Sequence, residues 1–239
     1  MKILGLDSSG IVASVAIVED ENLIAEYTVN YKKTHSQTLL PMLDELVKMT
    51  ELDLDTIDAI AVAAGPGSFT GLRIGSATAK GLGLALKKPL VEIPTVDALA
   101  YNLYDSRALI CPIMDARRSQ VYTGIYRFQE HKLVTVEAQM AVPMAEMIEK
   151  LNARGEEVVF LGDGVPVFGK MIQENLKVPY SFAPAHVNKQ RAAAVAALGL
   201  IYYREGKTET AMEHVPDYLR VSQAERERAE REKEQKPAG

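Results

Sequence analysis

The sequence of 239 residues has one cysteine and no tryptophan. A single cysteine, Cys111, cannot form an internal disulfide, and this favours a reducing compartment. No run approaches the roughly 18 uninterrupted apolar residues of a membrane span, because the longest candidate, residues 192–203, ends at Arg204. The first residues also lack the apolar region and small-residue cleavage site of a secretory signal. These absences exclude a membrane-spanning protein and predict a cytoplasmic one.

Positive charge and clustered metal ligands are scarce as well. The chain carries 27 Lys and Arg against 32 Asp and Glu, which gives a net charge of -5. That balance argues against a protein that holds RNA on its own by neutralising phosphates. The four histidines are far apart and none belongs to a His-x-x-x-His pair, so a zinc peptidase is unsupported.

The hydrophobic pattern predicts an α/β chain with a repeated order of elements. At roughly 150 residues per domain, the length allows one large domain or two lobes. In the first hundred residues three strands precede a helix, a buried strand and a glycine-rich helix, and the second half repeats this βββαβα order. We therefore predict a first lobe over residues 1–105, a second over 106–222, and a charged tail over 223–239. The tail either extends a terminal helix or is disordered.

The segment 63–75, AAGPGSFTGLRIG, joins a buried strand to the glycine-rich helix. A glycine-rich turn at a helix N-terminus can cradle phosphate, but the Gly-Lys-Ser/Thr ending of a Walker A loop is missing. The alternative is a tight turn in which Ser68 or Thr70 caps the helix. Within the helix small residues recur every four positions, which allows close packing either inside this chain or against a partner.

Asp7 ends the first predicted strand and is followed by Ser8, Ser9 and Gly10. This arrangement resembles the first phosphate loop of actin-like ATPases, and Asp115 would be its counterpart in the second lobe. The alternative is an ordinary turn in which the aspartate side chain bonds to the backbone two residues on. We therefore keep Asp7, Ser8 and Asp115 as candidate binding residues, and we identify no catalytic residue and no metal ligand.

Three segments, ILGLDSS, HSQTLLPML and AGPGSFTGLRIGSATAKGLGLAL, resemble the TsaB family (also called YeaZ) of bacterial tRNA threonylcarbamoyladenosine biosynthesis proteins. The resemblance covers residues 1–220. It implies the actin-like, Hsp70-like and sugar-kinase-like (ASKHA) fold, which has a duplicated βββαβα core. The element order read from the hydrophobic pattern agrees with that fold independently.

The resemblance also implies a role. In the sister family TsaD, two histidines four residues apart bind the catalytic metal, whereas the matching positions here are Thr95 and Leu99, which cannot replace imidazole ligands. The family picture is a non-catalytic scaffold that binds and activates TsaD, with the ATPase TsaE docked on the pair. Their complex adds threonylcarbamoyl to the adenosine beside the anticodon (position 37) of tRNAs that read codons beginning with A. ATP and metal would belong to the partner subunits, and tRNA would be reached only through the complex.

The predicted helices over residues 36–49 and 71–86 carry more apolar and small residues than a three-stranded sheet readily covers. We predict that they pair with TsaD and, in its absence, with a second copy of the chain as a symmetric homodimer. The residues expected in this interface are Leu39, Leu43, Leu46, Leu72, Gly75, Ala79 and Gly83. The alternative function is an actin-like ATPase or small-molecule kinase, in which Asp7 and Asp115 face each other across a cleft.

Overall fold

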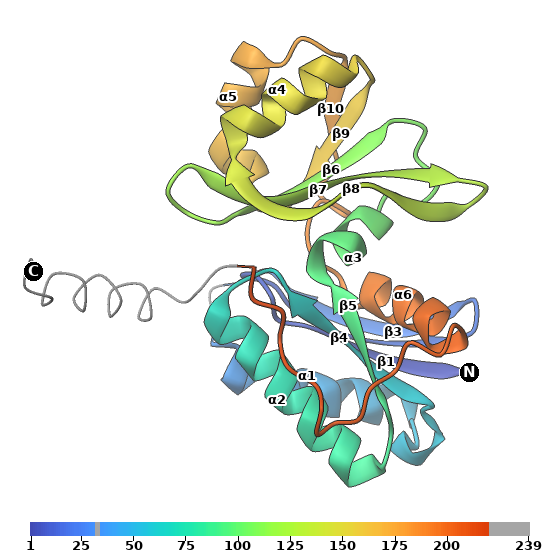
Figure 1. Ribbon diagram of the computed structural model, residues 1–239. Helices are drawn as coiled ribbons and strands as arrows, with labels where there is room; N and C mark the ends of the chain where they lie inside the picture. The colour runs from blue at the N-terminus through green and yellow to red at the C-terminus, as the bar shows by residue number, and fades with distance from the viewer. Residues whose placement is uncertain (32–33, 220–239) are drawn as a thin grey trace, which may run out of the picture.

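A computed structural model describes residues 1–31 and 34–219, and the predicted tail over residues 223–239 lies outside this part of the chain. The described residues form two lobes, each built on a five-stranded sheet (Figure 1). The first three strands of each lobe form an antiparallel meander, and a helical crossover then returns the chain to pair parallel with the first of them. The predicted βββαβα order is therefore confirmed in both lobes.

The sheet of the first lobe has the order β3-β2-β1-β4-β5. Its central strand β1 is almost entirely buried, because helices cover both faces of the sheet. The elements of this lobe, in chain order, are β1 (Lys2–Asp7), β2 (Ala13–Glu19), β3 (Asn22–Val29), α1 (His35–Thr50), the 3₁₀ turn η1 (Leu54–Thr56), β4 (Ala59–Gly65), α2 (Phe69–Leu86) and β5 (Leu90–Pro94).

The sheet of the second lobe has the order β10-β9-β6-β7-β8, and the sequence pattern missed its three-residue edge strand β10. Helices α4 and α5 pack on one face, while α3 packs on the other and so lies between the lobes (Figure 1). The elements are α3 (Thr95–Tyr101), β6 (Leu109–Asp115), β7 (Gln120–Gln129), β8 (Lys132–Pro143), α4 (Met144–Arg154), β9 (Val158–Leu161), α5 (Val165–Asn175) and β10 (Tyr180–Phe182).

The last helix, α6 (Ala192–Arg204), packs on the sheet of the first lobe, against β1, β2, β4 and β5, and also contacts α3 between the lobes. Glycines allow this close approach: a Cβ at Gly5 would lie 2.4 Å from the carbonyl oxygen of Ala192, and one at Gly199 would lie 2.5 Å from the Cβ of Ala61. The prediction that residues 106–222 form the second lobe is therefore wrong for residues 192–219.

The segment that follows α6, residues 205–219, is called the strap below. It runs back along the first lobe, where Glu209 pairs antiparallel with Leu90 at the edge of β5. Farther on, the Asp217 N–H donates to the carbonyl of Ala64 at 2.8 Å. The strap therefore closes an edge of the sheet that would otherwise expose unpaired backbone groups.

The seven residues predicted to form the partner interface are buried in the core of their own chain. The five side chains among them are at most 4% exposed, and the two glycines are buried as well. These residues face the sheet. They shield its apolar side chains on that side, such as Leu4, Leu6 and Val15, from solvent. The prediction that they contact a partner is therefore wrong. The seven residues are Leu39, Leu43, Leu46, Leu72, Gly75, Ala79 and Gly83.

Among the described residues, the helices are all too short or too polar to cross a lipid bilayer.

Ala79 and Ala77 lie on opposite sides of α2 and give a direct test of this orientation. Ala79 is fully buried, whereas Ala77 is exposed. Ala79→Lys should lower the free energy of unfolding by more than about 3 kcal/mol, because a buried unpaired ammonium is strongly unfavourable. Ala77→Lys should change it by less than about 0.5 kcal/mol. Urea unfolding followed by circular dichroism measures both, and equal stabilities would contradict this orientation of α2.

Candidate functional site

A cleft of about 440 Å³ lies between the lobes, where an actin-like ATPase would hold its nucleotide. The first lobe contributes the loop after β1 and the turn before α2. The second lobe contributes the end of β6 and the turns that follow β6 and β9. The cleft is lined by Ser9, Gly10, Ile11, Gly67, Ser68, Met114, Asp115, Ala116, Arg117, Tyr122, Asp163 and Val167.

Asp7 is not among the residues that line this cleft, because it is 1% exposed and lies beneath the loop. Its Oδ1 accepts hydrogen bonds from the backbone N–H of Ser9 at 2.9 Å and from the Ser9 hydroxyl at 2.6 Å. Burial raises its pKa from 3.8 to about 6, although the two Ser9 bonds act in the opposite direction. The side chain thus forms the turn that the sequence offered as the alternative to a metal-binding role.

The glycine segment packs against this loop and does not form an open phosphate cradle. The Ser8 hydroxyl donates to the carbonyl of Gly71 at 2.8 Å, and the Ser68 N–H donates to the carbonyl of Ser9 at 2.6 Å. A Cβ at Gly71 would lie 2.0 Å from the Ser8 carbonyl oxygen. Ser68 also caps α2, since its hydroxyl accepts from the Gly71 N–H at 3.3 Å. The glycines therefore serve close packing, which was the second interpretation of the sequence.

Asp115 does line the cleft, but its carboxylate is satisfied within its own turn. Its Oδ1 accepts from the Arg117 N–H at 2.8 Å, and its Oδ2 pairs with the Arg117 guanidinium at 3.2 Å. The Asp115 N–H in turn donates to Asp163, whose pKa is raised by burial. The structure therefore does not bring Asp7 and Asp115 face to face, as the kinase interpretation required.

The two positions that match the metal-binding histidines of TsaD lie in α3. Thr95 and Leu99 are both buried, at 0% and 1% exposure, and Leu99 packs in the apolar cluster between α3 and the second sheet. Across residues 1–31 and 34–219, no group of three or more His, Cys, Asp or Glu side chains is placed to hold a metal ion.

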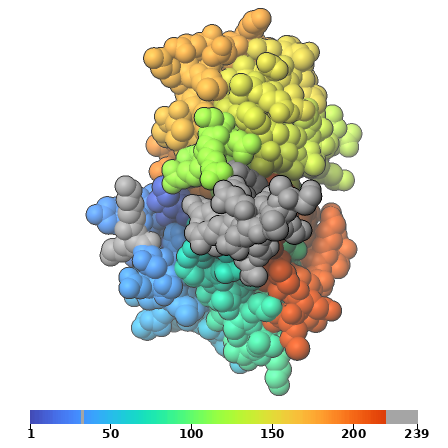
Figure 2. Space-filling model, turned by 60° about the vertical axis from the view of Figure 1, so that its left-hand side comes forward, coloured from blue at the N-terminus to red at the C-terminus, as the bar shows by residue number. Residues whose placement is uncertain are grey.

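The exposed sides of α1 and α2 form a surface that the sequence analysis missed. The two helices lie side by side on one face of the molecule, as Figure 2 shows in blue and teal. Large apolar side chains are exposed on both, with Leu40 at 52%, Met49 at 77% and Leu84 at 59%. The exposed side of α2 also carries a row of small residues, since Ala77, Gly81 and Ala85 follow one another at four-residue spacing. We call Leu40, Leu84 and these three small residues the helix face.

Gly81 distinguishes this second row of small residues from the buried one. A Cβ at Gly81 would meet no atom within 4 Å, so packing inside the chain does not require a glycine there. A glycine in a helix interior costs about 1 kcal/mol relative to alanine. The sequence did contain the signal, because the rows 71, 75, 79, 83 and 77, 81, 85 are equally regular; it did not show which row faces the core.

Comparison with known proteins connects this geometry to a family. Residues 22–228 match the family model described as TsaD: tRNA N6-adenosine threonylcarbamoyltransferase. The chain is 34% identical to the tRNA threonylcarbamoyladenosine biosynthesis protein TsaB of Bacillus subtilis over 225 residues, which cover 94% of this chain and 96% of the relative. The chain belongs to the TsaB family.

Solved structures agree with this membership. YeaZ from Pseudomonas aeruginosa superposes with a TM-score of 0.78 at 26% identity, over 91% of this chain and 99% of that one. An inorganic polyphosphate/ATP-glucomannokinase from Arthrobacter superposes with a TM-score of 0.51 at 13% identity, over 85% of this chain and 99% of the kinase. The second likeness shows the fold alone. The predicted ASKHA fold is therefore confirmed for this TsaB-family chain.

Titration of Asp7 should make the stability of the chain depend on pH. Because its folded pKa of about 6 exceeds the ordinary 3.8, its contribution is greatest below pH 4 and is lost as the pH rises through 6. The difference corresponds to about 3 kcal/mol. Asp7→Asn should flatten urea unfolding free energies over this range, whereas Asp44→Asn, at an exposed site on α1, should not. An Asp7→Asn profile as steep as the wild type would assign the effect to another group.

Proposed function

We propose that this chain is a non-catalytic scaffold subunit of the complex that adds threonylcarbamoyl to adenosine 37 of tRNAs reading codons that begin with A. In this proposal it binds and activates the catalytic subunit TsaD. The observation that carries the proposal is the likeness to the TsaB protein of Bacillus subtilis, which extends over 94% of the chain and nearly the whole relative.

The helix face supports a protein partner for this role. Leu40 on α1 and Leu84 on α2 are large apolar side chains exposed to solvent, and α2 also exposes a row of small residues. Small residues allow the backbone of a second helix to approach closely, and the apolar side chains around them supply the area that an interface buries. We propose that helices of TsaD pack here, through the opposite sides of α1 and α2 from those named in the sequence analysis.

The interior of the cleft supports a role without catalysis. Asp7 is buried, Asp115 is bonded within its own turn, and the histidine positions of TsaD are occupied by Thr95 and Leu99. We therefore propose that ATP and the catalytic metal are held by the partner subunits and that this chain supplies helices and not reacting groups.

The remaining partners follow from the same proposal. TsaE would dock on the pair formed with TsaD, and tRNA would be contacted only through the complex, since the chain carries a net charge of -5. In the absence of TsaD the helix face would close on a second copy with twofold symmetry. The compartment would be the cytoplasm, where the tRNA substrate is found.

An ATPase or small-molecule kinase is the second candidate, favoured by the cleft and by the likeness of the fold to a glucomannokinase. Such an enzyme needs a first-lobe carboxylate exposed to nucleotide and magnesium, whereas Asp7 is covered by its own loop. ATP hydrolysis that survives rigorous purification and disappears in Asp7→Ala would support this candidate over the scaffold.

Depletion of the chain should lower the threonylcarbamoyladenosine content of bulk tRNA, because the complex would lose the subunit that activates TsaD. Mass spectrometry of nucleosides from digested tRNA measures the modification directly. Re-expression of the wild-type chain should restore it. An unchanged level in depleted cells would refute the proposed function.

Gly81→Glu should abolish co-purification with TsaD without unfolding the chain. Glutamate is a better helix former than glycine, and open space surrounds a Cβ at this position, so the variant should melt at or above the wild-type temperature. Its charged side chain would nevertheless block close helix packing at the helix face.

Gly169→Glu is the matched control. Gly169 also lies inside a helix, α5 of the second lobe, and a Cβ there likewise meets nothing within 4 Å. It should bind TsaD as the wild type does. Normal binding of Gly81→Glu would show that TsaD does not pack on the helix face, and loss of binding by both variants would show that the effect is not specific to it.

A further inference from the structure

The strap runs along α2 from one end of the helix to the other. Near the C-terminal end of α2, a Cβ at Gly83 would lie 3.1 Å from the Cβ of Ala211. At its N-terminal end, the rings of Tyr218 and Phe69 pack with 4.5 Å between their centres. Figure 2 shows α2 in teal between α1 in blue and the strap in red. The exposed side of α2 is therefore bordered by a helix on one side and by the strap on the other.

Lys80 of α2 fixes the middle of the strap. Its ammonium donates to the carbonyl of His214 at 2.8 Å and to that of Met212 at 3.4 Å. His214 itself is buried, and its Nδ1 bonds to Glu209 at 2.5 Å. The backbone of the strap is thus held in place where it passes Lys80.

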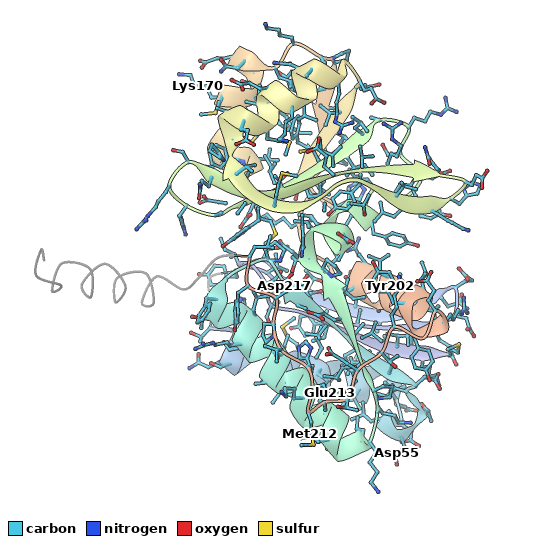
Figure 3. The ribbon with its side chains drawn as sticks, viewed as in Figure 1. Asp55, Lys170, Tyr202, Met212, Glu213 and Asp217 are labelled. Atoms are coloured by element: carbon cyan, nitrogen blue, oxygen red, sulfur yellow. The ribbon has the colours of Figure 1, made fainter. Side chains whose placement is uncertain are left out.

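Two apolar side chains project into solvent at this attachment. Met212 supplies one of the two carbonyls that bond to Lys80, and Val215 directly follows the residue that supplies the other. Met212 is 80% exposed and Val215 is 65% exposed, and Figure 3 labels Met212 where the strap passes α2. Leu84, also exposed, follows Lys80 by one helical turn and so lies on the same side of α2. The strap therefore adds apolar surface beside the helix face.

Charged groups at this border are already paired within the chain. Lys80 is bonded to the strap, and the Arg73 guanidinium donates to the Tyr218 hydroxyl at 3.3 Å. On α1, Lys48 pairs with Asp44 at 2.5 Å. A partner that packs here meets apolar and small side chains next to cations that already have partners. This chemistry favours the apolar side of a helix over an acidic segment or the phosphates of RNA.

We propose that the strap is part of the docking site for TsaD, and that Met212 and Val215 pack against apolar side chains of the TsaD helix that lies on the exposed row of α2. This inference rests on the proposed function, because it takes TsaD as the partner. The docking site then combines segments from both ends of the chain. Because Lys80 and the buried His214 already hold the strap, TsaD binds it without the entropy cost of ordering a loose segment.

Met212→Glu tests the strap directly. The Met212 side chain is largely in solvent, so the variant should keep the melting temperature of the wild type. A glutamate would place a charge against an apolar helix and should weaken the affinity for TsaD at least roughly tenfold. Isothermal titration calorimetry of the full chain with purified TsaD measures this affinity.

Met49→Glu is the matched control. Met49 is the same residue type on the same lobe and has nearly the same exposure, at 77%. It follows Met42 and Glu45 at helical spacing, and these two residues line a pocket against β3, so Met49 lies on the side of α1 next to that strand. Met49→Glu should bind TsaD as the wild type does.

The results separate this inference from the proposed function. If Gly81→Glu loses TsaD but Met212→Glu binds as tightly as the wild type, the strap is not part of the docking site and the inference is overturned. Equal losses in Met212→Glu and Met49→Glu also overturn it, because the effect would not be specific to the strap. Normal TsaD binding with loss of the homodimer in analytical ultracentrifugation would assign the strap to a second copy instead. A wild-type chain that does not bind TsaD would refute the proposed function itself, and this inference with it.

Discussion

The positions of both helices on the outer side of the first lobe depend on one contact between two backbone segments. The loop Asp7–Gly10 accepts hydrogen bonds from the first residue of α1, through Nε2 of His35 at 2.8 Å, and from Ser68 at the cap of α2. The contact exists only because Gly67 and Gly71 lack side chains, since a Cβ at either would lie within 2.3 Å of a loop carbonyl oxygen. A single four-residue loop thus sets where two helices begin.

This contact uses the polar groups that an ATPase of the same fold would leave open to ligand. The Asp7 carboxylate bonds to Ser9 within the loop, and the Ser8 hydroxyl donates to the carbonyl of Gly71 in α2. The cleft between the lobes remains, but the Asp7 carboxylate and the Ser8 hydroxyl form hydrogen bonds within the chain. These bonds fix where α1 and α2 begin relative to the sheet.

Periodicity sufficed to predict the two βββαβα cores, because amphipathic helices and buried strands leave a clear pattern in the sequence. It did not reveal which side of α2 faces the sheet, because small residues occupy two rows of that helix and only tertiary contact separates them. The placement of α6 was missed for a similar reason. Its alanine-rich sequence is compatible with packing on either sheet. It packs on the first sheet because Gly5 and Gly199 allow the helix to approach the strands closely. The turn formed by Asp7 was open to prediction, because that interpretation needs only local bonds.

The first lobe is built from both ends of the chain, and this bears on the meaning of its exposed residues. With α6 on one face of the sheet, α1 and α2 on the other, and the strap along β5, the core is already complete. Single apolar side chains such as Leu40 or Leu84 could be exposed on any protein without consequence. Gly81 is different, because it weakens its helix and no contact inside the described chain compensates for it. Under the proposed function, a partner packed closely on α1 and α2 would offset this cost.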